Sequence, residues 1–515
     1  MVSFGGVMVP RNSHDVDLLV IGAGPTGLTA ALEARRRGMT VRIVDRRDSR
    51  SQHSKALVVH ARTMEVFEDL GVAEEVSRRG VRFTALNLQG PLGARGRVDL
   101  LDLDWGDTDH PHWLTAPQYE TEQVLEAALT ERGVHVEWGT TFVGLVDEGD
   151  AVVADLRGPS AAQAHVRARW LLGSDGGRST VRDAIRGRLK RVDAGATFIL
   201  ADADTTSTLP QDEGHLYLHP DGLLIVVPMP QHDRWRIIAH VPGQSAASGP
   251  AINAEYLDNL IRARTSLEFG ASNVGWTSRF ALSHGVSDVH RRGRVFLAGD
   301  AAHVHSPVGG QGLNTGVQDA HNLVWKLAIA DRLPPDVREG LLESYATERG
   351  QVAHAMVGGV RRATSLITGR AGVARRIVGA LGPRVLRRRR LRLVLGRPLA
   401  GLEVTYSDSP LVVPGCRTAG ARVGNTATSA GGRVLSRLDP HRYTWVVREP
   451  ASGGRWGDLP VVEVSDDSEA PSVALVRPDG YIAACGTTQA EVWNSLARRP
   501  ALLGSARAST DPAES

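Results

Sequence analysis

The chain has 515 residues, of which 42% are hydrophobic and 23% are charged, so it can bury a large core divided among two or three domains. Its 60 basic residues nearly balance its 57 acidic residues, and this balance argues against a surface that binds nucleic acid. No apolar run is long enough to cross a membrane, so a membrane protein is not expected either.

The N-terminal segment and the cysteines indicate the cellular compartment in which the protein resides. The segment MVSFGGVMVPRNSHDVDLLVIG lacks the basic start of a signal peptide and is typical of a short lead into a strand. The only cysteines, Cys416 and Cys485, form no CxxC pair, so we expect no metal site and no dithiol redox centre. The sequence does not decide whether the two cysteines form a disulfide. Two free thiols suit a reducing cytoplasm, where we expect the protein to reside.

The first predicted elements are a strand, a glycine turn, a helix and a second strand, in DLLVIGAGPTGLTAALEARRRGMTVRIVD. Gly22, Gly24 and Gly27 form a GxGxxG motif that permits a tight turn, close approach of a pyrophosphate, and packing of the helix on the sheet. The helix N-terminus then faces the diphosphate. Asp45, at the end of the second strand, can accept hydrogen bonds from a ribose diol. The alternative is a purely structural turn, which we consider the weaker interpretation.

Further along, helices are expected at residues 63–70 and 120–132, and strands near residues 134–138, 152–156 and 166–172. The last of these strands runs into GSDGGRSTVR, a turn that combines glycines with charge. Its Asp175 could contact a cofactor. Alternatively, Asp175 or Ser179 could simply cap the helix that follows.

A change from mixed helix and strand patterns to long β patterns then divides the chain into units. Long β segments fill residues 185–292 and predict an inserted antiparallel sheet. The first unit, residues 1–184, is resumed at residues 293–400, which end in helical patterns and an arginine-rich run that we expect to be a solvated helix face. Residues 401–515 form a third unit of alternating strands with a closing helix.

A second glycine-rich stretch, FLAGDAAHVHSPVGGQGLNTG, lies well past the middle of the chain. Asp300 follows a buried strand, where its carboxylate can bind a sugar-like hydroxyl. Gly309, Gly310 and Gly312 leave room for the backbone to approach a flat ring, and a helical pattern starting near Thr315 points its positive end at that ring. A glycine-rich loop that merely caps a helix does not explain the acid beside these glycines.

In this order, the three motifs resemble those of the class A FAD-dependent monooxygenases, the aromatic hydroxylases related to para-hydroxybenzoate hydroxylase. The resemblance runs from about residue 17 to residue 349 and includes SKALVVHARTMEVFEDLG, LTAPQYETEQVLEAAL, GDAAHVHSPVGGQGLNTGVQDAHNLVWKL and LLESYATERG. It implies an α/β fold: a Rossmann-like FAD-binding domain, an inserted antiparallel β-sheet substrate domain, a helical segment, and a C-terminal thioredoxin-like α/β domain that lacks dithiol activity.

The resemblance also implies a set of residues that hold FAD without a covalent bond. Lys55 stands where the family usually has an arginine, Asp300 would bind the ribityl chain, and the amides of residues 312–314 would face the flavin pyrimidine ring. The full set comprises Gly22, Gly24, Pro25, Thr26, Gly27, Asp45, Arg46, Lys55, Arg62, Gln118, Asp175, Asp300, Pro307, Gly310, Gly312, Leu313 and Asn314.

The implied reaction is hydroxylation of an aromatic, phenolic substrate with NADPH or NADH and O2 through a C4a-hydroperoxyflavin. The arginine-rich composition suggests a polycyclic polyketide as substrate. Epoxidation, Baeyer–Villiger oxidation, antibiotic inactivation on the same fold, and a flavin-binding protein without turnover remain alternatives. We expect no metal, a transient site for the nicotinamide cofactor, and a monomer or homodimer.

No catalytic acid or base stands out from the sequence. His303, His305 and Pro307 are weak candidates beside the flavin stretch, and we favour structural roles for the two histidines. In the β insertion, a substrate pocket could be lined by Tyr217, Pro228, Met229 and Trp235, although most of these are expected to be core.

Overall fold

The structure is a computed structural model that describes residues 15–53, 56–90, 95–304, 310–368, 400–448, 459–465 and 471–508. The predictions made for Lys55, His305, Pro307, Gly309 and the arginine-rich run lie outside these residues. Among the residues described, no helix is long and apolar enough to cross a membrane.

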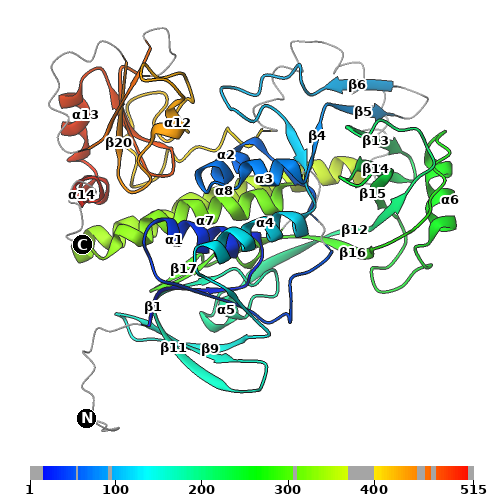
Figure 1. The fold of residues 1–515 in the computed structure, drawn as a ribbon, viewed down its shortest axis with the longest axis horizontal. Helices are drawn as coiled ribbons and strands as arrows, with labels where there is room; N and C mark the ends of the chain where they lie inside the picture. Colours follow the sequence, from blue (N-terminus) through cyan, green and yellow to red (C-terminus); the bar gives the residue numbers. More distant parts are fainter. Residues whose placement is uncertain are drawn as a thin grey trace.

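A mixed sheet forms the centre of the first unit (Figure 1). It contains β1 (Val16–Ile21), β2 (Val41–Asp45), β8 (Val136–Trp138), β9 (Thr141–Asp147), β10 (Val152–Arg157), β11 (Gln163–Gly173), β17 (Arg291–Arg292) and β18 (Val295–Leu297). Strands β18, β11, β1, β2 and β8 are parallel neighbours, while β9 and β10 form an antiparallel extension of β11. The predicted strand–turn–helix–strand start is therefore confirmed, and β18 shows that the sheet resumes after the insertion.

The inserted antiparallel sheet is also confirmed, with one difference. It contains β12 (Leu189–Asp204), β13 (Glu213–His219), β14 (Gly222–Pro228), β15 (Arg234–His240), β16 (Thr277–Ser287) and β19 (His303–Val304), together with β5 (Ala85–Gln89) and β6 (Arg95–Asp99). Three of these strands, β5, β6 and β19, come from stretches that the sequence assigned to the first unit. Strand β5 joins the insertion by pairing in parallel with β13. A separate small sheet consists of β3 (Val58–Val59), β7 (Trp113–Thr115) and β4 (Val81–Phe83).

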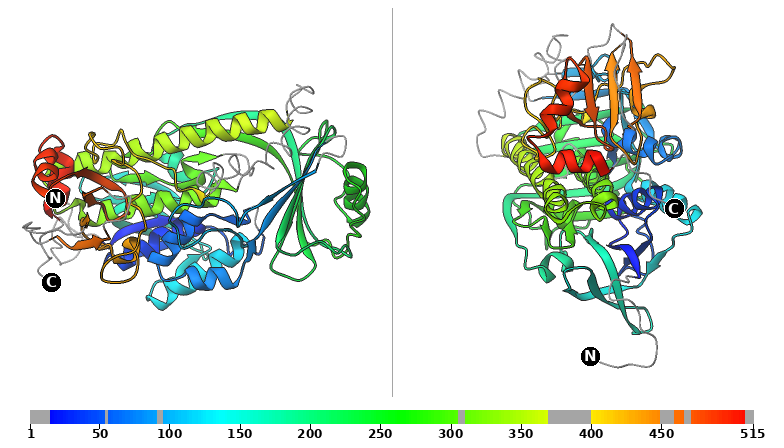
Figure 2. Two further views of the ribbon diagram at one scale, coloured as in Figure 1. Left: turned by 90° about the horizontal axis from the view of Figure 1, so that it is seen from above. Right: turned by 90° about the vertical axis from the view of Figure 1, so that its left-hand side faces the viewer.

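Alternation of side chains gives the inserted sheet two different faces. On one face, Trp235 and Ile237 pack against Leu257 and Ile261 of α6 (Ala254–Arg264), which covers the end of the molecule seen in Figure 2. The other face looks toward the first unit and is also apolar. A layer of apolar strand residues therefore lies next to the first unit.

Two long helices cross the middle of the molecule, α7 (Gln311–Ala330) and α8 (Pro335–Thr368). Helix α7 is buried along most of its length because it packs between α1 (Pro25–Arg36) and α8. It begins several residues before the predicted start, since the glycines of its first turns weaken the helical pattern. Helices α2 (Ala61–Asp69) and α4 (Gln118–Glu131) confirm the two other helices predicted in the first unit, whose remaining helices are α3 (Ala73–Arg78) and α5 (Thr180–Ala184).

The C-terminal unit is a small four-stranded sheet in the order β21–β20–β22–β23. Its elements are β20 (Thr444–Arg448), β21 (Val461–Val464), β22 (Val473–Val476), β23 (Ile482–Gly486), α12 (Val434–Arg437), α13 (Gln489–Leu496) and α14 (Pro500–Ala508). Strands β20 and β21 are parallel, and the other two pairings are antiparallel. Cys416 and Cys485 form a disulfide, with their Cα atoms 6.0 Å apart, so the option that the sequence left open is realised.

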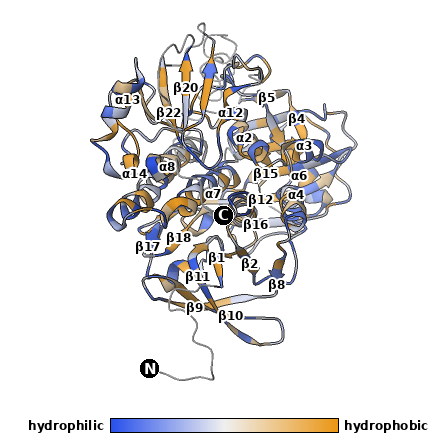
Figure 3. Ribbon diagram, turned by 60° about the vertical axis from the view of Figure 1, so that its left-hand side comes forward, coloured by the Kyte–Doolittle hydropathy of each residue, from blue (hydrophilic) through white to orange (hydrophobic). Residues whose placement is uncertain are grey.

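Apolar and charged contacts both fix the C-terminal unit to the rest of the protein. One buried cluster runs from β1, α1 and α7 into β20 and β22. Figure 3 shows β20 in the hydrophobic colour. Within this cluster, the rings of Trp325 and Tyr443 meet edge to face. Beside them, Glu348 of α8 accepts hydrogen bonds from Arg477 and from Lys326 in a fully buried ion pair network.

Candidate functional site

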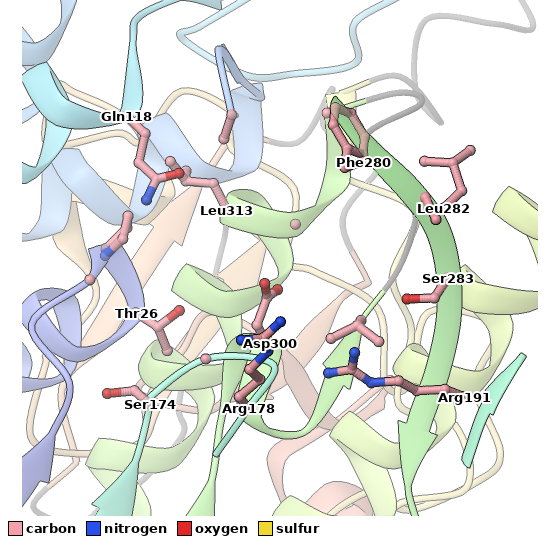
Figure 4. Close-up of a pocket in the computed structure, with 18 residues that line it drawn as sticks. Thr26, Gln118, Ser174, Arg178, Arg191, Phe280, Leu282, Ser283, Asp300 and Leu313 are labelled. Atoms are coloured by element: carbon pink, nitrogen blue, oxygen red, sulfur yellow. The ribbon is translucent and has the colours of Figure 1, made fainter. Parts of the chain in front are cut away.

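A cavity of about 550 Å³ lies where the N-termini of α1 and α7 meet the inserted sheet (Figure 4). This size lies within the range of cavities that hold small molecules and cofactors. Its walls come from both glycine motifs, the loop after β11, and strands β12 and β16. The lining residues are Gly24, Pro25, Thr26, Ala56, Gln118, Ser174, Gly176, Arg178, Arg191, Phe280, Ala281, Leu282, Ser283, Asp300, Val304, Gly310, Gly312 and Leu313.

The first glycine motif shapes one side of this cavity. Gly22 has φ +104°, and a Cβ there would lie 2.5 Å from the carbonyl oxygen of Ser174, so this turn requires glycine. A Cβ on Gly27 would collide with the carbonyl of Gly22, since the helix packs tightly on the turn. Gly24, in contrast, has nothing within 4 Å of an added Cβ. Its missing side chain therefore leaves open space beside the cavity, as a closely approaching phosphate would require.

The second motif presents the N-terminus of α7 to the same space. Gly310 has φ +63° and precedes the helix, which has no side-chain cap. The first amides of a helix have no acceptor within it, so those of Gly312 and Leu313 are available at the cavity wall. The side chain of Asn314 is occupied elsewhere. It accepts a 2.8 Å hydrogen bond from the amide of His60 and donates to the carbonyls of Val58 and Gly310. Asn314 thus anchors the start of α7, and its side chain does not line the cavity.

Asp300 is exposed toward the cavity from a short 3-10 turn, η2 (Gly299–Ala301). The turn is held by Asp319 of α7, whose carboxylate accepts hydrogen bonds from the amide of Gly299 at 2.8 Å, from His303 Nε2 at 2.8 Å and from Arg349 Nε at 2.6 Å. Burial raises the pKa of Asp319, but the Arg349 guanidinium and His303 outweigh it and hold that pKa well below its usual range. Asp319 is therefore an ionised anchor for the segment that carries Asp300.

Arg349 extends this anchor to the C-terminal unit. Its guanidinium donates to the carbonyl of Thr315 at 3.1 Å and to the hydroxyl of Tyr406 at 2.9 Å. Sequence reasoning missed the roles of both Asp319 and Arg349. They lie within GVQDAHN and ATERG, segments that supported the family resemblance, yet the sequence offers no sign that these two residues meet.

A second cavity, of about 250 Å³, adjoins the first and shares Gly24, Gln118, Ser174 and Gly176 with it. It is lined by the predicted residues Gly22, Asp45, Arg46 and Asp175, together with Glu122 and others. The two cavities together form an elongated site with an acid at each end, Asp45 and Asp300. This shape fits a dinucleotide that lies across both helix N-termini.

Asp175 has the capping role that the sequence allowed, and its position is compatible with the predicted cofactor contact. Its Oδ2 accepts hydrogen bonds from the amides of Thr180 at 2.7 Å and Val181 at 3.2 Å, while Ser179 accepts one from Arg182, so both predicted residues cap α5. Its Oδ1 is buried without a partner, and the residue lines the smaller cavity. Asp175 can therefore cap the helix and still face a ligand.

Two predicted cofactor or catalytic residues lie elsewhere. Arg62 is buried away from both cavities, where it donates to Glu65 at 2.9 Å and to the carbonyl of Asp479 at 2.8 Å. The side chain of Arg62 joins α2 to the C-terminal unit and lines neither cavity, so its position does not support the predicted cofactor contact. His303 is also buried and bonds Asp319, which agrees with the structural role that we favoured, with a carboxylate as partner instead of a carbonyl.

The inserted sheet contributes to the cavity wall through other residues than those the sequence indicated. Tyr217 and Trp235 pack in the core under α6, and neither Pro228 nor Met229 lines either cavity. The cavity wall is instead formed by Phe280, Leu282 and Ser283 of β16, with Arg191 of β12 beside them (Figure 4). Among the residues described, no group of histidine, cysteine or acidic side chains could hold a metal ion.

Comparisons with known proteins agree with this geometry. A family model described as FAD binding domain matches residues 15–360. The chain belongs to the class A FAD-dependent aromatic monooxygenases. It is 34% identical to 6-methylpretetramide 4-monooxygenase of Streptomyces rimosus, over 93% of this chain and 92% of that protein. It is 32% identical to a rifampicin monooxygenase of Streptomyces venezuelae, over 96% of this chain and 99% of that protein.

The solved structures give the same result for the fold. The anhydrotetracycline hydroxylase OxyS from Streptomyces rimosus superposes on this monooxygenase with a TM-score of 0.74 and 27% identity, covering 95% of this chain and 99% of that one. Because the match covers 95% of this chain, it includes the C-terminal sheet as well as the first unit. The protein is therefore an FAD-dependent aromatic hydroxylase, and the two joined cavities are its candidate active site.

Proposed function

We propose that this monooxygenase hydroxylates a phenolic ring of a polycyclic, polyketide-type substrate, using non-covalently bound FAD, NADPH or NADH, and O2. The observation that carries the proposal is the meeting of two surfaces at one cavity. The uncapped N-terminus of α7 presents the amides of Gly312 and Leu313, and β16 presents Phe280 and Leu282 nearby. A charged, flat cofactor suits the first surface, and an apolar ring system suits the second.

The bound flavin supplies the activation of oxygen, and the chain supplies its surroundings. The amides at the start of α7 stabilise negative charge on an adjacent ring by up to about 2 kcal/mol in a partly buried geometry. They need no reorganisation as charge develops, and they carry no side chain that titrates. Asp300 is placed to hold a hydroxyl-rich chain, and Asp319 keeps it there.

The size and character of the substrate are inferred from the inner face of the inserted sheet. Beyond Phe280, this face continues through partly buried apolar residues that pack together, namely Leu216, Leu218, Ile225 and Ile238. A broad apolar wall of this kind suits several fused rings better than a single small phenol. The names of 6-methylpretetramide 4-monooxygenase and of anhydrotetracycline hydroxylase support the same substrate class.

The nicotinamide cofactor is proposed to approach at the cavity mouth from the side of the DGGRS loop. Arg178 and Arg191 both line the cavity, and neither forms an ion pair with a carboxylate among the residues described. Two guanidinium groups without counter-ions suit a diphosphate. The chain has no second GxGxxG turn that would hold this cofactor permanently.

Antibiotic inactivation by the same chemistry is the second candidate. The full-length match to a rifampicin monooxygenase favours it. Hydroxylation, epoxidation and Baeyer–Villiger oxidation differ in the product and not in the fold, so product structure separates them. We further propose that the C-terminal unit is thioredoxin-like, supported by its parallel β20–β21 pair and antiparallel β22 and β23, and that its role is structural.

The test is a screen of phenolic polyketides and of rifamycins for stimulated NADPH oxidation by the FAD-loaded protein. A phenolic polyketide that stimulates oxidation and gains one oxygen supports the proposal. A response to rifamycins alone favours inactivation. Oxidation that no aromatic compound stimulates would reject both functions.

A further inference from the structure

The Asp45 carboxylate has no free acceptor position in the smaller cavity. Its Oδ2 accepts hydrogen bonds from the amide of Ala23 at 2.8 Å and from Arg47 Nη2 at 3.0 Å. Its Oδ1 accepts from the amide and from Nε of Arg47, at 2.9 and 3.1 Å. A carboxylate offers about four lone-pair positions. Protein donors therefore occupy all the acceptor positions of Asp45, the acid that the sequence assigned to the ribose diol.

A second carboxyl group in the same cavity is not filled. Glu122 of α4 is 1% exposed and lines the cavity beside Asp45. Its Oε1 accepts a 2.8 Å hydrogen bond from Gln118 Nε2, but its Oε2 is buried without a partner. A buried carboxylate oxygen that accepts no hydrogen bond destabilises the protein, so its position calls for a ligand donor.

The charges around Glu122 fit a ligand-facing group. Burial raises the pKa of Glu122, and it outweighs the hydrogen bond from Gln118 and the charges of Arg47 and Arg50, which lower that pKa; Asp45 raises it further. Both arginines are committed elsewhere, Arg47 to Asp45 and Arg50 to Glu126 at 2.7 Å. Glu122 therefore has no ion pair of its own among the residues described.

We propose that Glu122 is the hydroxyl acceptor for the adenosine ribose of the dinucleotide, in the subsite where Asp45 is held by Arg47. Asp45 then shapes the turn through Ala23 and orients Arg47, while the free Glu122 Oε2 receives a ribose O–H. The inference depends on the FAD site and not on the oxygenation reaction, so it stands even if the substrate proposed above is wrong.

The rival explanation is that Glu122 only positions Gln118. The two roles differ in which part of the cofactor they affect. Gln118 lines both cavities, whereas Glu122 lines only the smaller one. A direct ribose contact should affect FAD and ADP but not FMN, which lacks the adenosine half. If Glu122 acts only by positioning Gln118, its substitution should weaken the binding of FMN as well.

The experiment measures binding of FAD, FMN and ADP to the apoprotein by calorimetry, for the wild type, Glu122→Gln and the control Glu120→Gln. Glu120 lies on the same helix but pairs with Arg79 at the surface. Loss of the acceptor in Glu122→Gln should raise the dissociation constants of FAD and ADP at least about fivefold. The dissociation constant of FMN should stay within about twofold of the wild-type value. The control should match the wild type for all three.

A second comparison uses ribose analogues and so does not depend on how well the variant folds. The wild type should bind either 2′-deoxy-ADP or 3′-deoxy-ADP more weakly than ADP, and Glu122→Gln should lose that discrimination. Unchanged binding of FAD and ADP by Glu122→Gln would overturn the proposal. An equal loss for FMN, or discrimination that survives in the variant, would overturn it too.

Discussion

The carboxylate of Asp319 accepts a 2.8 Å hydrogen bond from the backbone amide of Gly299, the residue immediately before the cavity acid Asp300. The same carboxylate is paired with Arg349 at 2.6 Å, and both side chains are 1% exposed. One buried ion pair thus ties the cofactor segment to α7 and α8. Through Tyr406, Arg349 also connects this pair to the C-terminal unit.

Substitution Asp319→Asn should destabilise the protein and loosen FAD. Removing one partner of a buried pair leaves the Arg349 charge uncompensated, at a cost of about 3–5 kcal/mol. Thermal unfolding and the rate of FAD release would measure both effects. The control is Asp331→Asn, which removes a partly exposed partner of Arg169 and should cost no more than about 1 kcal/mol. Equal effects of the two substitutions would contradict the anchoring role.

The same ion pair predicts how stability depends on pH. The pKa of Asp319 is lower in the folded protein than in the unfolded chain, where an aspartate titrates near pH 4. The unfolded state therefore takes up the proton first as the pH falls. The contribution of Asp319 should be complete above about pH 5 and should decline progressively below about pH 4. The melting temperature of the wild type should fall more steeply than that of Asp319→Asn across this window, and parallel curves would argue against the shift.

Alanine substitution can separate the roles of the second and third glycines of the first motif, Gly24 and Gly27. Gly24→Ala should leave the apoprotein as stable as the wild type, because the added Cβ meets no protein atom within 4 Å, yet it should weaken FAD binding by crowding the cofactor. Gly27→Ala should instead destabilise the apoprotein, because its Cβ would collide with the turn. Melting of the apoprotein and FAD titration would distinguish them. Normal FAD affinity in Gly24→Ala would place the diphosphate elsewhere.

The proposed nicotinamide site predicts a selective defect. The double substitution Arg178→Gln with Arg191→Gln should raise the dissociation constant for NADPH by about tenfold or more, since each charge-assisted hydrogen bond contributes about 1.5–3 kcal/mol. Anaerobic flavin reduction at varied NADPH concentration measures this constant. FAD retention and reduction by dithionite should stay normal, and Arg157→Gln, at the exposed end of β10, is the control. A loss of substrate affinity with unchanged NADPH affinity would assign the two arginines to the substrate.

The disulfide should stabilise the C-terminal unit without a part in catalysis. Cys416→Ser with Cys485→Ser opens a link between residues 69 apart in sequence, and about 2–4 kcal/mol of stability should be lost. The hydroxylation rate at a temperature well below unfolding should remain unchanged, because neither cysteine lines either of the two cavities of the candidate active site. A large loss of rate in a folded double variant would reveal a thiol or disulfide role.

Sequence patterns located the parts of the site that depend on backbone geometry. Gly22, Gly24 and Asp45 follow from a local strand–turn–helix pattern, and Asp300 follows from an acid at a strand end before glycines. Such patterns involve neighbours in sequence, so they can be recognised without a structure. The pattern of α7 was harder to read because Gly312 and Gly316 interrupt it.

The parts that the sequence did not predict depend on contacts between distant segments. Asp319 and Arg349 meet only because α7 and α8 pack side by side. Arg62 points to the C-terminal unit, where it donates a hydrogen bond to the carbonyl of Asp479. Strand β5 joins the inserted sheet through pairing with β13, more than a hundred residues away. Likewise, the occupancy of the Asp45 carboxylate by Arg47 could not be read from the residue types.

The central claim is that this protein transfers one atom of O2 to an aromatic ring. The most direct test is turnover of a phenolic polyketide by the FAD-loaded enzyme with NADPH under isotopically labelled O2, followed by mass spectrometry and NMR of the product. The account predicts a single labelled hydroxyl group on an intact ring, formed only when FAD and NADPH are both present. A product labelled from water, a ring-expanded lactone or an epoxide, or NADPH oxidation that yields only hydrogen peroxide with every substrate, would contradict it.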